Sequence, residues 1–193
     1  MISALILAAG ESSRMGRDKA LLDYRGKTFL EHIVATQREA GLERTVVVLG
    51  HHAEEIRRAV NLAGAEVVVN QDYRLGQTSS LQAGLRALVQ PETDAVVLCL
   101  VDHPAVSADI VKQLVAAFQE TAAPVVVPTY QGRRGHPVLI ARPLFGELLS
   151  LDPHQGANTI IRKYRDATHC VEVQDPGILL DIDDPKAYRQ LTP

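Results

Sequence analysis

The opening stretch of the chain constrains the fold most, because an apolar segment runs directly into a loop of small and basic residues. Residues 2–7 are apolar except for Ser3, a pattern typical of a buried strand. The loop that follows contains Gly10, Arg14, Gly16, Arg17 and Lys19. Backbone N–H groups of such a loop can bind phosphate oxygens, and Arg and Lys can supply fixed positive charge. The stretch therefore indicates a strand followed by a phosphate-binding loop.

This loop differs from the two best-known phosphate-binding motifs. A Walker A loop requires Gly-Lys-Ser/Thr after its first glycine, whereas here Met15 lies five positions after Gly10 and Ala20 follows Lys19. The spacing Gly-x-Gly-x-x-Gly is also missing. We expect Gly10 to adopt backbone angles that other residues avoid and to let the chain approach a ligand closely. On the residues alone, an ordinary strand-to-loop turn with solvated basic side chains stays open as an alternative.

Hydrophobic periodicity along the rest of the chain predicts alternating strands and helices. Further strands are expected at about 46–49, 66–69, 95–100, 125–127, 138–141, 171–173 and 179–182. Helices are expected at about 28–41, 53–63, 78–89, 107–120, 143–149, 156–164 and 185–191. Such alternation is typical of a parallel sheet covered on both faces. The fold class is therefore α/β, a Rossmann-like three-layer sandwich with a mostly parallel central sheet, in one domain spanning residues 1–193.

Four local signals sharpen this outline. Thr28 and Glu31 have the spacing of a capping box at a helix start. The segment 95–100 is wholly apolar, which predicts a central strand. Pro128 is expected to stop the strand before it. Thr78 or Ser79 is expected to cap the helix that follows a polar loop at residues 70–76.

Composition excludes several classes of function. The formal charge of −3 argues against a general nucleic-acid or membrane-surface binder. No apolar run approaches the roughly 20 residues that cross a bilayer, and no secretory signal is visible, so we expect a cytoplasmic protein. The two cysteines, Cys99 and Cys170, are expected to stay reduced.

Acidic residues follow the predicted central strand and precede the last helix. Asp102 comes directly after the strand, and ligands of open α/β sheets gather at the carboxyl ends of strands. A carboxylate there can hold Mg²⁺ or simply cap a turn. Asp181 and Asp183 are separated by one residue and would point the same way if the segment were a strand. A helix N-cap is the alternative role of Asp183.

The opening stretch resembles the signature of a known family. Leu7-Ala8-Ala9-Gly10-x-Ser12-x-Arg14-Met15-Gly16-x-x-Lys19 resembles the MobA-like nucleotidyltransferases, and its Ala-Ala-Gly form is most similar to the molybdenum cofactor cytidylyltransferases (MocA type). The resemblance implies the fold of nucleotide-diphospho-sugar transferases. It also implies that Leu7, Ala8, Ala9, Gly10, Ser12, Gly16 and Lys19 bind nucleotide, with Arg14, Lys19 and Asp102 catalytic.

Four further segments carry the resemblance, and one departs from it. The segment from Gly76 to Leu81 resembles a Ser-rich family motif, which implies nucleotide binding by Gly76, Ser79 and Ser80. Gly135, His136 and Pro137 match a motif that implies acceptor binding. Asp102 matches the metal-binding aspartate of the family's Asp-x-Pro motif. Asp183 matches the second metal ligand, with Asp181 in reserve. Asn158 stands where relatives often have Arg, and His154-Gln155 precedes Gly156 instead of Gly-Asp.

The resemblance implies transfer of CMP from CTP to molybdopterin or molybdenum cofactor, with Mg²⁺ as cofactor and release of pyrophosphate. A molybdoenzyme or its chaperone would be a further partner. Guanylyl transfer, nucleotidyl transfer to a sugar phosphate, and a nucleotide-binding regulator without turnover are the alternatives. The complete set of Arg14, Lys19, Asp102 and Asp183 argues against the regulator.

Overall fold

The computed structural model describes residues 1–90 and 92–191. An eight-stranded sheet has the order β10-β7-β9-β6-β1-β4-β5, with β8 paired to β7. Its strands are β1 (Ile2–Ala8), β4 (Thr45–Leu49), β5 (Ala65–Val69), β6 (Ala95–Leu100), β7 (Val125–Tyr130), β8 (Arg133–Arg134), β9 (Val138–Ala141) and β10 (Thr168–Glu172). The pairs β1–β4, β1–β6, β4–β5 and β7–β10 are parallel, whereas β9 runs antiparallel to β6 and β7. The predicted α/β class with a mostly parallel sheet is confirmed.

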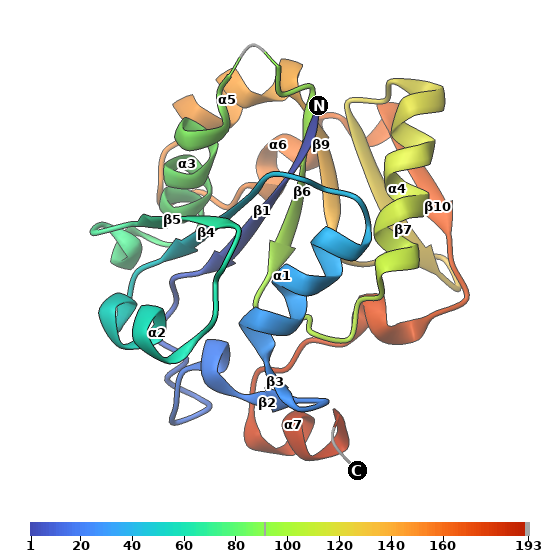
Figure 1. Ribbon diagram of the computed structural model, residues 1–193. Coiled ribbons are helices and arrows are strands. Elements are labelled where there is room, and N and C mark those ends of the chain that lie inside the picture. The colour runs from blue at the N-terminus through green and yellow to red at the C-terminus, as the bar shows by residue number, and fades with distance from the viewer. Residues whose placement is uncertain (91, 192–193) are drawn as a thin grey trace.

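Helices cover both faces of the sheet, which gives three layers (Figure 1). The helices are α1 (Phe29–Glu39), α2 (Ala53–Ala59), α3 (Gln77–Leu88), α4 (Ala108–Thr121), α5 (Phe145–Ser150), α6 (Asn158–Lys163) and α7 (Pro185–Leu191). One apolar cluster joins the sheet to α1, α2 and α4, and a second joins it to α3, α5 and α6. Among the described residues, no helix is both long and apolar enough to cross a bilayer.

The two central strands bring the candidate residues of the first half together. β6 occupies the middle of the sheet, as its apolar sequence predicts. In the β1–β6 register, Ile2 pairs with Ala95 and Leu7 with Leu100. The loop after β1 and the Asp102 turn after β6 therefore leave the sheet at the same edge, although they are far apart in sequence.

A small lobe covers this edge. The hairpin β2 (Asp23–Tyr24) and β3 (Lys27–Thr28) lies against α7 at the lower end of Figure 1. A third apolar cluster holds the lobe together through Met15, Leu22, Tyr24, Phe29 and Ile182. The predicted capping box at the start of α1 is confirmed, because the Thr28 hydroxyl accepts from the Glu31 N–H and the Glu31 carboxylate accepts from the Thr28 N–H.

Some predicted boundaries are wrong. Strand β7 continues through Pro128, because the fixed φ of proline suits extended backbone and its carbonyl still accepts from the Gly135 N–H. Residues 179–182 form no strand: a 3₁₀ turn at Pro176–Leu179 leads into irregular backbone. Helix α3 begins at Gln77 with Gly76 as N-cap and no side-chain cap. Helix α2 ends at Ala59 because Val60 is extended.

Gly84 sets how closely α3 approaches the sheet. A Cβ at Gly84 would lie 2.2 Å from Leu5 Cδ1 and 2.8 Å from Val48 Cγ2, inside the buried layer. We predict that Gly84→Ala lowers the free energy of unfolding by about 1–3 kcal/mol, the usual cost of overpacking. Denaturant unfolding measures it. Gly146→Ala is the matched control, because a Cβ there meets nothing within 4 Å, and it should be neutral or stabilising. Equal stability changes in the two variants would contradict the prediction.

Candidate active site

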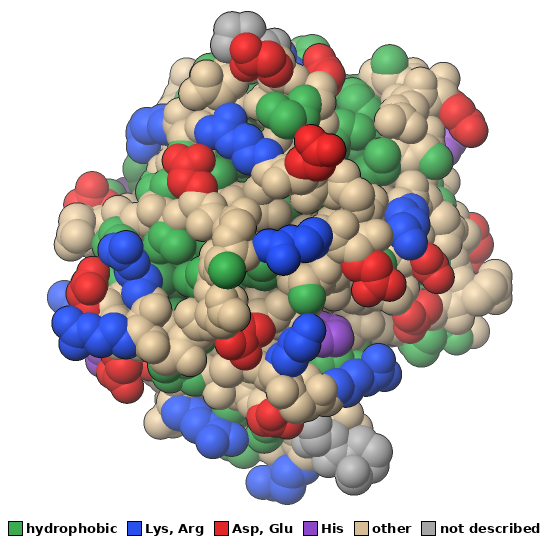
Figure 2. All heavy atoms as spheres, in the orientation of Figure 1, with side chains coloured by type: hydrophobic (Ala, Val, Ile, Leu, Met, Phe, Trp, Pro, Cys, Tyr) green, Lys and Arg blue, Asp and Glu red, His purple; other side chains and the backbone are tan. Residues whose placement is uncertain are grey.

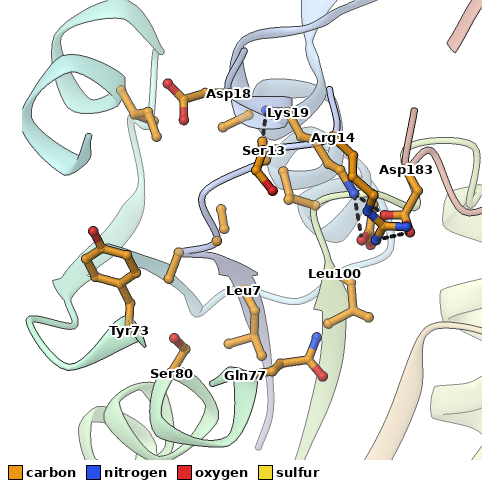
Figure 3. Close-up of a pocket in the computed structure, with 18 of the residues that line it drawn as sticks. Leu7, Ser13, Arg14, Asp18, Lys19, Tyr73, Gln77, Ser80, Leu100 and Asp183 are labelled. Carbon is orange, nitrogen blue, oxygen red and sulfur yellow. Dashed lines mark hydrogen bonds and ion pairs between the residues drawn. The ribbon is translucent and has the colours of Figure 1, made fainter. Parts of the chain in front are cut away.

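A cavity of about 370 Å³ opens at the carboxyl ends of β1 and β6. The loop after β1, the start of α3, the Asp102 turn and the C-terminal segment form its walls (Figure 3). Its lining includes these predicted site residues: Leu7, Ala8, Ala9, Gly10, Ser12, Arg14, Lys19, Gly76, Ser80, Asp102 and Asp183. Eleven of the sixteen predicted positions thus meet in one place, drawn from four separate segments of the chain.

Lys19 lies at the centre of the polar contacts in this cavity. Its Nζ lies 3.3 Å from Asp102 Oδ2 and 2.5 Å from Asp183 Oδ1, and its side chain is only 11% exposed. Arg14 Nη2 forms a further ion pair with Asp183 Oδ2, and Figure 3 shows these groups converging. The hydrogen bond from Lys19, helped by the Arg14 charge, holds the pKa of Asp183 below its usual value. Two basic and two acidic groups thus balance one another.

Ile182 places Asp183 beside Asp102. Its N–H donates to the Asp102 carbonyl at 2.9 Å, and its side chain is fully buried in the third apolar cluster. Asp184 caps α7 by accepting from the Lys186 and Ala187 N–H groups. The N-cap alternative for Asp183 is therefore wrong, and its carboxylate is directed to the basic residues.

The glycines of the first loop have roles different from those expected. Gly10 is not in the left-handed region, and the space where its Cβ would lie is open. Ser12 and Gly16 are the loop residues with positive φ, at 51° and 75°. Gly16 lies outside the cavity lining. The Ser12 hydroxyl accepts from the Lys19 N–H at 3.1 Å, which closes the loop.

The hydroxyls at the start of α3 are mostly committed to the protein itself. Ser79 lies outside the cavity lining, and its hydroxyl donates to the carbonyl of Asp72 or Gly76. Asn70 Nδ2 donates to the hydroxyls of both Ser79 and Ser80. Thr78 donates to the Gln155 carbonyl. Their internal partners explain why three hydroxyls stand together here, and only Ser80 among them also lines the cavity.

Sequence reasoning missed several lining residues. Ser13, Asp18, Tyr73 and Gln77 also face the cavity, as Figure 3 shows. Asp18 and Gln77 each adjoin a predicted residue, so their positions in the two motifs were a usable signal. Tyr73 has no such signal, because its place depends on close packing against Gly50, where a Cβ would lie 2.7 Å from Tyr73 Cβ.

The predicted acceptor residues do not line this cavity. Gly135 and His136 line a second depression, whose volume is about 380 Å³, and Pro137 is buried beside it. Gly135 packs closely against the backbone of Ile178, since a Cβ at Gly135 would lie 2.4 Å from the Ile178 carbonyl oxygen. The His136 ring contacts the His103 ring with centroids 4.6 Å apart, and His103 Nε2 lies 3.8 Å from Asp102 Oδ1. Two imidazoles, tilted by 37° relative to each other, thus lie between Asp102 of the first cavity and the second depression.

The donor set beside Asp102 fits a divalent cation. Asp102 Oδ1 is buried and has no hydrogen-bond partner among the described residues. Asp102, His103 and Asp181 offer ligand atoms that all lie within 4.8 Å of one another. Burial, and then the charges of Asp102 and Asp183, raise the pKa of Asp181, as expected for a carboxylate that lies near two other carboxylates. Both oxygens of Asp183, by contrast, are in ion pairs.

A cavity at the carboxyl ends of parallel strands, lined by a small-residue loop with basic and acidic groups, defines a nucleotide-binding α/β protein. The chain belongs to the family of the MobA-like NTP transferase domain, whose profile matches residues 4–168. This nucleotidyltransferase family confirms the resemblance found in the sequence.

Relatives in this family have diverse names. The chain is 32% identical to nicotine blue oxidoreductase of Paenarthrobacter nicotinovorans, over 98% of this chain and 96% of that protein. It is 28% identical to molybdenum cofactor cytidylyltransferase of Escherichia coli (strain K12), over 97% and 93%. It also resembles the crystal structure of Rv0371c from Mycobacterium tuberculosis H37Rv, with a TM-score of 0.88 and 33% identity over 98% and 96% of the chains. Another structure of Rv0371c, with a TM-score of 0.83 to this chain and 32% identity, is a complex of that protein with manganese.

His136 gives a measurable test of the site geometry. Burial, aided by repulsion from His103, lowers its pKa from 6.5 to about 4. His136 should therefore stay neutral in the folded protein at pH 5.5, while the unfolded chain binds a proton. The free energy of unfolding should fall as pH drops from about 6.5 towards 4, and His136→Gln should remove this component.

NMR titration of the imidazole C–H signals in the metal-free protein measures this pKa. His52 is the internal control, because its hydrogen bond to Asp18 raises its pKa above 6.5, opposite in direction to His136. A His136 midpoint at or above 6.5 would contradict the geometry.

Proposed function

We propose that the protein transfers CMP from CTP to the phosphate of a molybdopterin-type acceptor and releases pyrophosphate. An acceptor phosphate oxygen attacks the α-phosphorus, a new P–O bond forms, and the bond to the bridging oxygen of pyrophosphate breaks. The attacking group is already an anion, so the reaction requires no general base. Positioning and charge stabilisation then supply the catalysis.

The observation that carries this proposal is the position of Lys19. Its ammonium group lies in the cavity at the end of the central strand, between two carboxylates and next to the loop of residues 7–16. A triphosphate in this loop would accept hydrogen bonds from backbone N–H groups of the loop and would form ion pairs with Arg14 and Lys19. The charge of the leaving pyrophosphate grows in the transition state, where these two side chains would stabilise it.

Asp102 and Asp183 are the proposed ligands of Mg²⁺, and Asp181 is the alternative to Asp183. Oxygen donors suit this hard cation, and Asp102 Oδ1 is buried with no hydrogen-bond partner in the part of the chain that the structure describes. When bound, the ion would neutralise phosphate charge and polarise the α-phosphate. Lys19 and Arg14 would then shift from Asp183 towards the phosphates, because both basic groups gain a more highly charged partner there.

The relationship to the E. coli cytidylyltransferase supports CTP and molybdopterin, and the Ala8-Ala9-Gly10 sequence supports a pyrimidine. Cytoplasmic location and delivery to a molybdoenzyme or its chaperone follow from the same proposal. The second candidate function is an oxidoreductase, a class that the name of the 32% identical nicotine blue oxidoreductase favours, and a nicotinamide dinucleotide would then occupy this cavity. Pyrophosphate release and consumption of reduced nicotinamide distinguish the two reactions.

A matrix of nucleotides and acceptors, scored by pyrophosphate release, tests the proposal. Wild type should turn over CTP with molybdopterin in the presence of Mg²⁺. Asp102→Asn and Asp183→Asn should each lower the rate about a hundredfold or more, because a transition-state contact worth several kcal/mol is lost. Asp181→Asn is the comparison. Electron paramagnetic resonance measures how tightly Asp181→Asn and Asp183→Asn bind Mn²⁺, and the variant with the weaker Mn²⁺ binding identifies the second metal ligand. Consumption of reduced nicotinamide without pyrophosphate release would favour the oxidoreductase, and nucleotide binding without either reaction the regulator.

Ala9 is the residue proposed to select the base. It is 5% exposed and both lines the cavity and packs in the apolar layer with α3. Its methyl group narrows the cavity, which favours a pyrimidine over a purine by exclusion. We predict that wild type prefers CTP to GTP and that Ala9→Gly reduces the ratio of their kcat/KM values. An unchanged ratio would assign base choice to another segment, such as the start of α3. A preference of wild type for GTP would overturn the cytidylyl assignment.

A further inference from the structure

The second depression is a basic cavity. Its volume is about 380 Å³, and it lies between the ends of β7 and β9 and helix α6. Its lining residues are Val127, Arg134, Gly135, His136, Val138, Asn158, Ile161, Arg162 and Arg165. The three arginines come from separate elements: β8, α6 and the 3₁₀ turn at Arg165–Ala167. The chain thus brings three guanidinium groups to one cavity from positions up to 31 residues apart in sequence.

No acidic group balances this charge. None of the lining residues is Asp or Glu. Within residues 1–90 and 92–191, the guanidinium groups of Arg134, Arg162 and Arg165 form no ion pair or hydrogen bond. Lys163, next to Arg162, differs in this respect, because it pairs with Glu147 at 2.7 Å. Figure 2 shows acidic and basic side chains interspersed over the face of α1, α2 and α4. Three unpaired guanidinium groups around one hollow have the donors and charge that bind an organic anion.

The basic cavity opens at the same edge of the sheet as the cavity around Lys19, where the proposed function places the nucleotide (the nucleotide cavity). Because β9 is antiparallel, its first residue, Val138, pairs with Leu98 near the carboxyl end of β6. β7 lies on the other side of β9, so only β9 separates β7, at the basic cavity, from β6, at the nucleotide cavity. Adjacent strands of a sheet are roughly 5 Å apart. The two cavities also border the same apolar layer under α3 and α6. Leu100 of this layer lines the nucleotide cavity, and Ile161 lines the basic cavity. The contacting rings of His136 and His103 lie between the basic cavity and Asp102.

We propose that Arg134, Arg162 and Arg165 bind a second anionic group of the acceptor, at the end remote from its reacting phosphate. This inference rests on the proposed function, because it assigns the basic cavity to the acceptor. The acceptor is then a phosphorylated organic compound with at least two separate anionic groups. Val127, Val138 and Ile161 supply apolar surface for the body between them. Asn158 leaves this part of α6 without a charge, and Arg162 lies one turn further along the same helix.

Inorganic phosphate is the probe for the cavity itself. The ¹⁵N-labelled protein is titrated with phosphate while a non-hydrolysable CTP analogue fills the nucleotide cavity. The amide signals of Gly135, Asn158 and Ile161 should shift in a saturable way. Arg162→Gln and Arg165→Gln should each weaken binding about tenfold, the usual effect of losing a charged hydrogen bond. Added salt should weaken it further, because the arginines are exposed.

Arg86→Gln is the matched control. Arg86 is exposed, lies in the last turn of α3, and forms no ion pair or hydrogen bond within the described part of the chain. The Arg86→Gln variant should bind phosphate with the same affinity as wild type. Shifts that do not saturate, or that survive in both cavity variants, would overturn the assignment of an anion site.

Kinetics separate this inference from the proposed function. With molybdopterin as acceptor, the cavity variants should raise the acceptor KM about tenfold with little change in kcat, since the bonds are made equally before and during reaction. If wild type releases no pyrophosphate but binds phosphate through the arginines, the proposed reaction fails and the anion site stands. If wild type turns over and the variants keep the wild-type KM, the reaction stands and the acceptor role of the arginines fails.

Discussion

The site depends on one buried ammonium group. Lys19 Nζ is surrounded by carboxylates from segments 83 and 164 residues away along the chain. A largely buried charge needs such partners, because moving it out of water without them costs several kcal/mol. Lys19 therefore holds the loop after β1, the Asp102 turn and the C-terminal segment at fixed positions relative to one another. The apolar cluster around Ile182 provides the packing that lets these segments meet.

Through the same contacts, the basic and acidic groups of this cavity neutralise one another. The positive charges of Arg14 and Lys19 neutralise Asp183, and Asp102 shares Lys19. A divalent cation needs the carboxylates, and a triphosphate needs the basic groups. Under the proposed function, each ligand would release the groups that the other requires. Metal and nucleotide would thus bind with positive coupling, and linkage makes that coupling reciprocal.

Strand ends explain one part of the site that the sequence predicted. Leu7 to Gly10 lie at the end of one apolar run and Asp102 follows another, and parallel strands place their carboxyl ends at one edge. The sequence predicts nucleotide binding by Ser79, because a hydroxyl can donate to a ligand as well as to the protein itself. Only its contacts with Asn70 and Asp72, seen in the structure, distinguish these two roles. Residues 179–182 are apolar except for Asp181, as in a short strand, yet the N–H of Ile182 bonds to a turn rather than to a strand. Contacts between distant segments decide such cases, and local patterns do not contain them.

The basic cavity illustrates the same limit from the functional side. Arg134, Arg162 and Arg165 share no motif, and each alone is an exposed arginine. Their convergence depends on β9 running against its neighbours, which turns the segment before it back over the sheet edge towards α6. The nucleotide cavity, in contrast, is built on the two strands at the centre of the sheet. A fold of this kind can keep its central cavity while loops and short helices around β9 change the second one. Relatives at about 30% identity carry the names of a cytidylyltransferase and of an oxidoreductase, so the shared fold does not by itself set the reaction.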